Sequence, residues 1–400
     1  MTVALQAVAL GEVASFIRGI TFKPSDVVPV ETPGVVLCMR TKNVQAHLDL
    51  SDVWAVSSSL VKRTDQFLRS GDILVSSANS WNLVGKCCWI PPLDSPSSFG
   101  GFVSVLRANP SKVDPRYLYH WFSSPRIQAT VRSFGQQTTN ISNLNIERCL
   151  NLGLPLPPLE EQWRIAEVLD RAAELRAKRR EALAQLDDLT QSIFLDMFGD
   201  PVENPRGHHV RPLAEWIDQR RPVTYGILKP GENTQDGPKY VRVVDMKNGQ
   251  IDPTDIRRTS WEISDQYRRS VLRGGDLLMS IRGHVGRLAI VPGSLDGANI
   301  TQDSARLAVD ARSAHYVMEC IRTPALQRWM QKRTKGAAVQ GINLSDVKLI
   351  PLPEPPLAEQ QEFEKRATAV EALKAVHRQS LNELDDLFAS LQDWAFRGLL

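Results

Sequence analysis

Two long stretches of the chain carry a hydrophobic pattern with a period of seven residues. Residues 159–198 contain no Pro or Gly, and there the repeat falls on Ile165, Ala172, Arg179, Leu186 and Ile193. Near the C-terminus it falls on Phe363, Val370, His377, Leu384 and Leu391. A repeat of seven over about five heptads is typical of a coiled coil, so each stretch predicts one long helix.

These helices are longer than a single domain needs. At about 1.5 Å per residue, about 36 residues span about 54 Å, which exceeds the width of a domain of about 150 residues. The alternative is an amphipathic helix that packs along its own domain. The length favours helices that extend past their domains, and the nearest partner for each is the other helix.

The remaining sequence combines short apolar runs with turn residues, which predicts a globular α+β fold. The first block has candidate strands at Gly34–Met39, Asp72–Val75 and Phe102–Leu106, followed by a helix over 117–133. The second block has candidate strands at Tyr240–Val244, Asp276–Ser280 and Ala305–Val309, followed by a helix over 314–332. Both blocks therefore predict the same order of elements.

The same motifs occur twice, in the same order and about 200 residues apart. Residues 157–162 read PPLEEQ and residues 355–360 read PPLAEQ. The other pairs are Gly71-Asp72-Ile73-Leu74 with Gly275-Asp276-Leu277-Leu278, Val84-Gly85-Lys86 with Val285-Gly286-Arg287, Asn143-Leu144 with Asn343-Leu344, and Leu186-Asp187-Asp188-Leu189 with Leu384-Asp385-Asp386-Leu387. The chain is therefore two copies of one unit. We expect globular blocks at 1–150 and 201–350, and helices within 151–200 and 351–400.

Two tandem copies imply a pseudo-two-fold axis, and an axis that crosses a helix pair makes the pair antiparallel. Arg179 and His377 hold equivalent positions near the middle of the two helices, so we expect them to lie close together. Two interpretations stay open for this pair. Both side chains extend to the surface beside Glu181 and Glu174, or they form a polar contact that fixes the register.

Charge alternates along the chain, although the formal net charge is only +3. Residues 1–150 carry 14 Lys and Arg against 10 Asp and Glu, and residues 201–350 carry 23 against 16. Both helical segments are acidic, with 6 against 10 and 5 against 9. An anionic partner would therefore prefer the two blocks, and the acidic helices need another explanation.

Other compartments and classes are disfavoured by the sequence. No 18-residue stretch is free of charge, so we expect no transmembrane helix and no membrane partner. The N-terminal residues lack the basic region of a signal peptide. Five cysteines without C-x-x-C spacing favour a reducing cytoplasm, with neither a disulfide framework nor a zinc site.

The doubled motifs resemble the specificity subunit of type I restriction–modification systems, and the resemblance covers nearly the whole chain. It is carried by the order of block and helix, the Asn-Leu pairs, the P-P-L-x-E-Q openings, and the G-D-[IL]-L runs followed by V-G-[KR]. The chain departs from this pattern in its longer second Pro-rich run, PLPEPP against PLPP. The resemblance implies two tandem target recognition domains, each reading one half of a split double-stranded DNA sequence. It also implies that the paired helices hold the halves apart and dock two methyltransferase subunits, with motor-nuclease restriction subunits joining them.

The sequence predicts no catalytic residues, cofactor or metal site. An adenine methyltransferase needs a [DN]-P-P-[YF] motif, and the chain has none. Gly85-Lys86 is followed by Cys87 and so does not complete a P-loop, and Gly283–Gly286 is only part of a dinucleotide fingerprint. His208 and His209 have no nearby carboxylate or Cys ligand cluster.

We expect DNA contacts from loop residues with cationic, amide or aromatic side chains. Arg, Asn and Gln can bond bases bidentately, whereas Lys mostly contacts phosphates. The first-block candidates are Arg18, Lys23, Arg40, Lys42, Asn43, Asn79, Trp81, Asn82, Lys86, Gln136, Gln137 and Asn140. The second-block candidates are Arg220, Arg221, Tyr225, Lys229, Arg242, Lys247, Arg282, His284, Arg287, Lys332, Lys335 and Gln340. Arg282 is the strongest, because Gly283 would let the backbone approach the duplex closely.

Two other functions stay open at this stage. The chain could serve a restriction system in which cleavage and methylation share one partner chain. It could also be a coiled-coil assembly protein whose basic blocks bind protein and not DNA.

Overall fold

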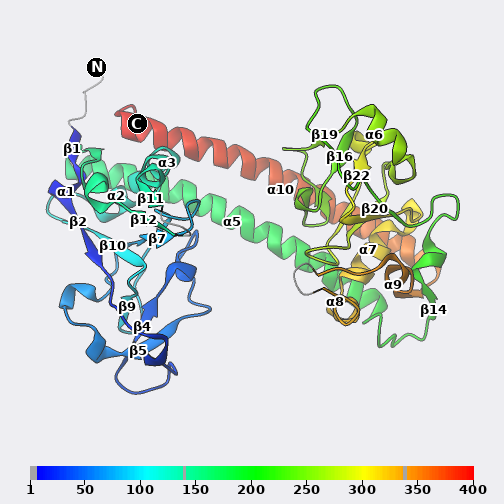
Figure 1. Cartoon of the computed structure of the whole chain (residues 1–400), viewed down its shortest axis with the longest axis horizontal. Coiled ribbons are helices and arrows are strands. Elements are labelled where there is room, and N and C mark those ends of the chain that lie inside the picture. Colours follow the sequence, from blue (N-terminus) through cyan, green and yellow to red (C-terminus); the bar gives the residue numbers. More distant parts are fainter. Residues whose placement is uncertain (1–6, 138–140, 337–339) are drawn as a thin grey trace. The chain divides into compact units, whose positions relative to one another are not determined.

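The computed structural model describes residues 7–137, 141–336 and 340–400 (Figure 1). The chain divides into two compact units. Unit 1 comprises Met1–Lys178 and Leu381–Leu400, and unit 2 comprises Arg179–Ser380. Each unit combines small sheets with helices, which confirms the α+β prediction, and each unit contains part of both long helices.

Unit 1 contains two four-stranded sheets. The first is antiparallel, with the order β2 (Ala14–Arg18), β10 (Val103–Ala108), β6 (Ile73–Ser76) and β8 (Cys87–Trp89). The second has the order β3 (Val27–Val28), β5 (Trp54–Ser57), β4 (Val35–Met39) and β9 (Ser97–Phe99), and its last pair is parallel. The strands predicted in the first block are confirmed as β4, β6 and β10.

Smaller elements of unit 1 flank these sheets. The helices are α1 (Leu10–Val13), α2 (Pro115–Phe122), α3 (Pro125–Ser133) and α4 (Ile146–Leu150). A two-stranded sheet pairs β1 (Ala7–Ala9) with β13 (Gly153–Pro155), and a three-stranded sheet has the order β11 (Gly135–Gln137), β12 (Ser142–Leu144) and β7 (Ala78–Asn79).

Unit 2 repeats this plan with shorter strands. Its four-stranded antiparallel sheet has the order β15 (Thr224–Tyr225), β23 (Ser304–Leu307), β20 (Leu277–Ser280) and β21 (Leu288–Ile290). Its other strands are β14 (His209–Pro212), β16 (Lys239–Val241), β17 (Met246–Lys247), β18 (Gln250–Ile251), β19 (Arg257–Arg258), β22 (Asn299–Ile300) and β24 (Pro351–Glu354). Its helices are α6 (Trp261–Gln266), α7 (Ala314–Arg322), α8 (Pro324–Gln331) and α9 (Leu344–Lys348). The predicted strand at Tyr240–Val244 is too long, because a 3-10 turn begins at Val243.

The strand predicted around each G-D motif is buried on both faces, and successive side chains enter different cores. In unit 1, Ile73 and Val75 pack with α2, whereas Leu74 packs with residues of the second sheet. In unit 2, Leu277 and Met279 pack with α7, and Leu278 belongs to a separate cluster. In each unit one sheet therefore separates two hydrophobic cores, and unit 1 has a further, smaller cluster around Val36 and Val56.

The single helices predicted over 117–133 and 314–332 are wrong. In the structure each region is two helices, α2 with α3 and α7 with α8. The second helix begins in both cases at a proline, Pro125 or Pro324. Proline has no N–H to continue the preceding helix but fits the first turn of a new one.

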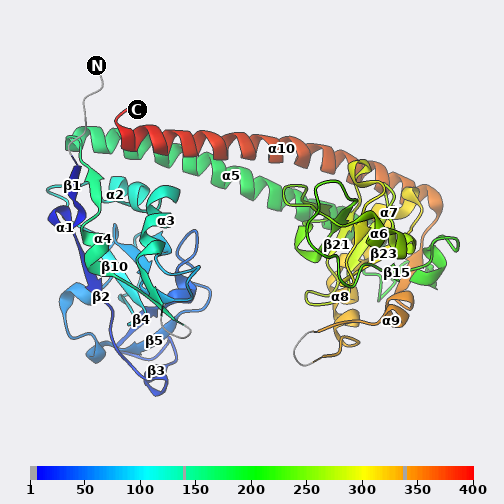
Figure 2. The same ribbon diagram turned by 45° about the horizontal axis from the view of Figure 1, so that its top comes forward.

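The long helices are confirmed as α5 (Leu159–Phe198) and α10 (Leu357–Arg397). Within each unit the two helices lie side by side and antiparallel (Figures 1 and 2). In unit 1, Ile165 and Leu391 pack in one hydrophobic cluster. In unit 2 the rings of Phe194 and Phe363 meet with centroids 5.6 Å apart.

Polar contacts along the pair repeat the internal symmetry. Arg179 Nη1 lies 3.1 Å from His377 Nδ1, which confirms that these residues meet. Arg176 pairs with Asp385 at 2.5 Å in unit 1, and the equivalent Lys374 pairs with Asp187 at 2.7 Å in unit 2. Lys374 is buried with its ammonium group among Asp187, Glu371 and Thr190. Ion pairs between the two helices at matched positions favour the register interpretation over side chains that extend to the surface.

The G-D motifs have a structural role in both units. The glycines adopt a positive φ, 95° at Gly71 and 90° at Gly275, which favours this residue type. The aspartates are buried and each accepts two hydrogen bonds from one arginine. Asp72 is bonded by Arg107 Nε at 2.7 Å and Nη2 at 2.7 Å.

The arginine that bonds the aspartate lies on β10 in unit 1, whereas in unit 2 it precedes β15. Asp276 accepts from Arg221 Nη1 at 2.7 Å and Nη2 at 2.6 Å, and from the backbone N–H of Arg273 at 2.7 Å. The motif therefore places a buried carboxylate at the start of the central strand, where an arginine satisfies it.

The P-P-L-x-E-Q openings tie each long helix to its block. Gln162 donates to Pro157 O and accepts from the N–H of Asp114, both at 2.8 Å. Gln360 donates to Pro355 O and accepts from the Ser313 hydroxyl, also at 2.8 Å. The same glutamine thus binds the end of the preceding Pro-rich strand and the start of α2 or α7.

Candidate nucleic-acid interface

The loop after the central strand of unit 1 gathers several predicted contact residues. Strand β12 pairs with β7 on one side and with β11 on the other, so Asn79 and Gln136 belong to one three-stranded sheet with β12 between them. Trp81 and Asn82 follow β7 and are exposed, Trp81 by 56%. Asn79 is half-buried and donates to the Ser76 hydroxyl at 3.0 Å. The sheet thereby presents amides and one exposed indole on a single loop cluster.

In unit 2 the equivalent cluster is held by single β-bridges between residues outside the named strands. Arg282 and Lys335 both pair with Gly341, and the N–H of Gly283 donates to Gln340 O at 2.8 Å. The side chains of Arg282, His284, Lys335 and Gln340 are exposed. Gly283 has φ of 71°, and a Cβ built there would meet no atom within 4 Å, so the surrounding space is open.

A second turn supports each cluster from the neighbouring strand. In unit 1, Phe102 O accepts hydrogen bonds from the N–H groups of Ser77 and Ala78, both at 3.0 Å. In unit 2, Asp303 O accepts from the N–H groups of Ile281 and Arg282. Phe102 is 62% exposed beside Gly100 and Gly101. Sequence reasoning missed Phe102, because it lies within a run predicted to be a buried strand.

A hollow of about 570 Å³ adjoins the Phe102 turn. It is lined by Phe22, Arg40, Lys42, Trp54 and Phe102, among others. The Arg40 guanidinium lies 3.8 Å above the Trp54 ring, and both Arg40 and Lys42 pair with Asp52. Asp52 therefore neutralises part of this cationic surface, and its pKa is lowered by the hydrogen bond from Lys42.

Several predicted contact residues are committed to the protein itself. Asn43 is buried, with 1% exposure, and its side chain bonds the backbone of Arg40, Asp49 and Asp52. The other members of this group are half-buried, and the side chain of each donates a hydrogen bond within the protein. Lys86 donates to Gln45, Arg221 to Asp276, Arg242 to Asp245 and Asp255, and Arg287 to the carbonyls of Val243 and Met246. The hydrogen bond to Asp245 raises the pKa of the Arg242 guanidinium above its ordinary value.

The other candidates do not join either loop cluster by any hydrogen bond or bridge within the described part of the chain. All of them are exposed, and they are Arg18, Lys23, Arg220, Tyr225, Lys229, Lys247 and Lys332. Lys247 pairs with Asp252 at 2.7 Å, and its hydrogen bond lowers the pKa of that carboxyl. Gln137 belongs to β11, and Asn140 lies outside the described residues.

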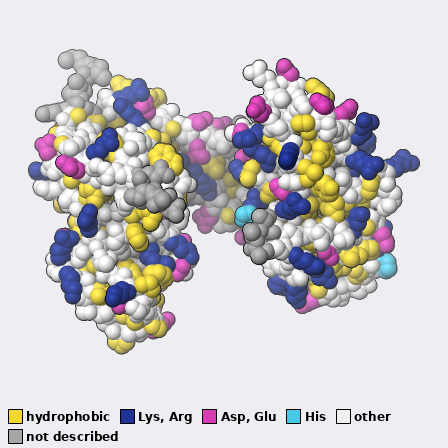
Figure 3. All heavy atoms as spheres, viewed as in Figure 1, with side chains coloured by type: hydrophobic (Ala, Val, Ile, Leu, Met, Phe, Trp, Pro, Cys, Tyr) yellow, Lys and Arg dark blue, Asp and Glu magenta, His cyan; other side chains and the backbone are white. Residues whose placement is uncertain are grey.

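Lys and Arg side chains are spread over the viewed face of each unit, with hydrophobic side chains between them (Figure 3). Among the residues that the structure describes, no group of three His, Cys, Asp or Glu side chains could hold a metal ion. The search of those residues also found no helix long and apolar enough to cross a membrane.

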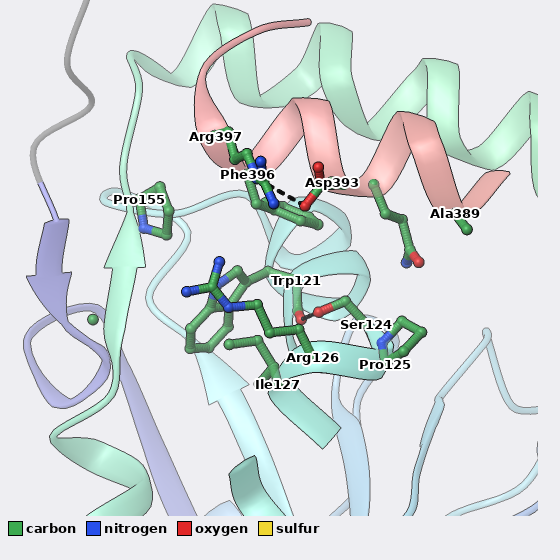
Figure 4. Close-up of a pocket in the computed structure, with 12 residues that line it drawn as sticks. Trp121, Ser124, Pro125, Arg126, Ile127, Pro155, Ala389, Asp393, Phe396 and Arg397 are labelled. Carbon is green, nitrogen blue, oxygen red and sulfur yellow. Dashed lines mark hydrogen bonds and ion pairs between the residues drawn. The ribbon is translucent and has the colours of Figure 1, made fainter. Parts of the chain in front are cut away.

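Another hollow of unit 1, of about 400 Å³, lies between the α2–α3 turn and the C-terminal part of α10 (Figure 4). Trp121, Ile127 and Phe396 make it largely apolar, and its Asp393 and Arg397 pair with each other at 2.9 Å. None of the predicted contact residues lines it, so it is not part of the candidate interface.

Comparison with known proteins gives consistent matches over most of the chain. A family model described as "Type I restriction modification DNA specificity domain" matches residues 4–185 and 219–386. The type I restriction enzyme EcoBI specificity subunit of Escherichia coli is 26% identical over 360 residues, covering 82% of this chain and 73% of that protein. The EcoKI specificity subunit of E. coli strain K12 is 24% identical over 425 residues, covering 97% and 87%. The crystal structure of a type I S subunit from M. genitalium matches with a TM-score of 0.52 at 16% identity, covering 98% and 96% of the two chains.

Proposed function

Because the chain belongs to the type I restriction modification DNA specificity family, we propose that it reads a bipartite, asymmetric DNA site. Each unit reads one half through its loop cluster. A specificity subunit is the DNA-recognition component of such a complex and not its catalyst. The residues 1–150 and 201–350 are then the target recognition domains, and 151–200 and 351–400 are the spacer helices.

One observation carries this proposal: the two loop clusters occupy the same place on the repeated scaffold but carry different side chains. Unit 1 presents Asn79, Trp81 and Asn82, whereas unit 2 presents Arg282 and His284. Asn and Gln suit adenine, and Arg suits guanine in the major groove. Equivalent loops with unlike donors and acceptors are what two different half-sites require.

The partners follow from the helices. Exposed leucines recur at equivalent positions, Leu175 with Leu373 and Leu189 with Leu387, each between 45% and 54% exposed. Covering exposed apolar side chains with a partner removes them from water, which is favourable. We propose that this duplicated surface docks two copies of a methyltransferase subunit, and that motor-nuclease restriction subunits join the assembly.

DNA binding by the assembly with methyltransferase is expected to weaken steeply with salt. Each phosphate contacted contributes a slope of about −0.9 to the dependence of log K on log salt concentration. The chain alone is expected to bind without sequence preference, because the excess of basic residues in each block is small. A gel-shift titration of the chain with and without methyltransferase tests both statements. Salt-insensitive binding by the assembly would contradict the proposal.

Replacement of Arg282 by Ala is expected to relax recognition at one half-site. Loss of a bidentate contact to guanine costs about 1–3 kcal/mol of discrimination. Methylation-sensitive sequencing of DNA modified by the assembly reports both half-sites at once. The exposed Arg328→Ala serves as the control, because Arg328 lies on α8 and not in the loop cluster. A change at both half-sites would show that the two units do not read independently.

A further inference from the structure

Unit 2 contains a hollow of about 490 Å³ whose lining is dominated by arginine. The arginines come from three separate segments of the chain, and they are Arg220, Arg221, Arg268, Arg269, Arg273 and Arg306. The hollow lies at the beginning of β20, beside Asp276, whereas the loop with Arg282 follows the end of that strand. It is therefore separate from the loop cluster that reads DNA in the proposed function.

The inner wall of this arginine pocket is held rigidly. Arg221 is fixed by its two hydrogen bonds to Asp276. Arg306 is 3% exposed and donates to the backbone carbonyls of Arg269, Val271 and Pro222. Its Nε is buried without a hydrogen-bond partner in the described structure. Burial lowers the pKa of Arg306, and the neighbouring charge of Arg221 adds to this.

The outer wall carries four exposed arginines, of which Arg268 donates from Nε to Asp265 O at 3.3 Å. Arg220, Arg268, Arg269 and Arg273 are exposed. Within the described residues, the side chains of Arg269 and Arg273 have no hydrogen-bond or ion-pair partner. Two acidic residues bond this lining. Asp276 has both oxygens occupied by Arg221, and Asp218 Oδ1 accepts from the backbone N–H of Arg220 at 2.9 Å. The arginines therefore carry a charge that the protein leaves largely uncompensated.

We propose that the arginine pocket binds a phosphate group. Guanidinium groups match phosphate oxygens in charge and in bidentate geometry, and several converging arginines favour phosphate over a single carboxylate. The cluster is not repeated in full in unit 1, because alignment of the G-D motifs places Asp65 at the position of Arg269, although Arg69 matches Arg273. The site is therefore specific to unit 2.

Two sources could supply the phosphate. One source is the DNA backbone. At about 3.3 Å per residue, the six residues from Asp276 to Arg282 span about 20 Å at most. The major groove is about 12 Å wide, so a backbone phosphate beside the groove could lie at the pocket while Arg282 contacts a base. The other source is a free nucleotide or polyphosphate. The inference goes beyond the proposed function, and only its DNA form rests on that function.

The test compares two double variants of the full chain with equal loss of charge. Arg269→Ser with Arg273→Ser removes the outer wall of the pocket, and Arg257→Ser with Arg328→Ser removes two exposed arginines elsewhere in unit 2. Inorganic pyrophosphate is titrated into each protein by calorimetry. The pocket variant is expected to bind at least about ten-fold more weakly than the control. No saturable binding by the unaltered chain, or equal loss in both variants, would overturn the proposal.

A second measurement identifies the source of the phosphate. The salt dependence of duplex binding is measured for the assembly with methyltransferase. A slope that falls in magnitude by about 0.9 or more in the pocket variant alone, with competition by pyrophosphate, supports a DNA backbone phosphate. An unchanged slope with lost pyrophosphate binding supports a free phosphate compound. If the assembly binds no DNA, the proposed function fails, while the pyrophosphate titration still decides the pocket.

If the pocket variant does not fold, charge-retaining Arg269→Lys with Arg273→Lys replaces it. Lysine keeps the charge but loses the bidentate geometry. Pyrophosphate affinity is then expected to fall by several-fold relative to Arg257→Lys with Arg328→Lys. Equal affinities in those two proteins would also count against the pocket.

Discussion

Four residues inserted at the same level in both long helices are expected to move the two DNA half-sites apart by one or two base pairs. The insertions fall between Arg180 and Gln185 in α5 and between Arg378 and Glu383 in α10. The antiparallel contacts place these segments opposite each other, since Arg176 meets Asp385 and Lys374 meets Asp187 on either side. Four residues add about 6 Å of helix, nearly two base-pair steps of about 3.4 Å.

Both helices must be lengthened because each forms part of both units. The insertion leaves the packing of Ile165 with Leu391 in unit 1 and of Phe194 with Phe363 in unit 2 intact. A four-residue insertion in a heptad pattern is accommodated by local unwinding of the coiled coil. It turns the helix about 40° beyond a full turn, in the range that added base pairs require.

Long-read sequencing of methylated DNA measures the gap and both half-sites together. The original sequence should lose methylation by at least about 100-fold, while the lengthened site gains it. The control carries the insertion in α5 alone, and it should lose activity on both sites because one helix then bulges from its partner. An active double insertion with an unchanged gap would disprove the spacer role of the helices.

Asp276→Ala is expected to destabilise unit 2 by about 3–5 kcal/mol, because it leaves Arg221 partly buried without its carboxylate. The repulsion between Arg221 and Arg306 then loses the neutralising charge of Asp276. Hydrogen exchange with mass spectrometry separates the two units, so residues of unit 1 serve as an internal reference. The exposed Asp265→Ala controls for loss of a carboxylate.

Asp72→Ala provides the mirror experiment, since it removes the partner of Arg107 in unit 1. Faster exchange should then be confined to unit 1. Equal protection in Asp276→Ala and Asp265→Ala would refute a stabilising role for the buried pair.

The long-range organisation was predictable because it repeats. The heptads identified both helices, and the doubled motifs identified equivalent places on two scaffolds. The breaks at Pro125 and Pro324 were visible in the sequence and were missed, although proline excludes a continuous helix. The hydrophobic periodicity therefore predicts whether a segment is helix or strand more reliably than it predicts the residue at which the element ends.

The interface was harder to predict, because residue type does not reveal whether a side chain is already bonded. Asn43 and Arg221 have the chemistry of base-reading residues, yet Asn43 is buried and Arg221 is held by Asp276. The arginine pocket was missed for a related reason. Its residues are separated by as many as 86 positions, from Arg220 to Arg306, and only the folded sheet brings them together.

The connection between helix and first strand differs between the units, although the elements correspond. In unit 2, residues 199–208 join α5 to β14, which pairs with β24. In unit 1, β1 pairs with β13 in the same way, and Val8 packs on the same core as Leu400 at the far end of the α10 segment. Arg164 Nη2 also donates to Leu400 O at 2.9 Å.

The order of elements is therefore a ring that is open at one of two equivalent points. Opening it at 199–208 and joining the two present chain ends would leave every strand pairing of the described residues in place. A chain half as long would contain one block and one helix, and two such chains would together contain all the elements of the ring. If each unit reads one half-site, as we propose, exchange of one block by recombination would change one half of the recognised sequence and leave the other half unaltered.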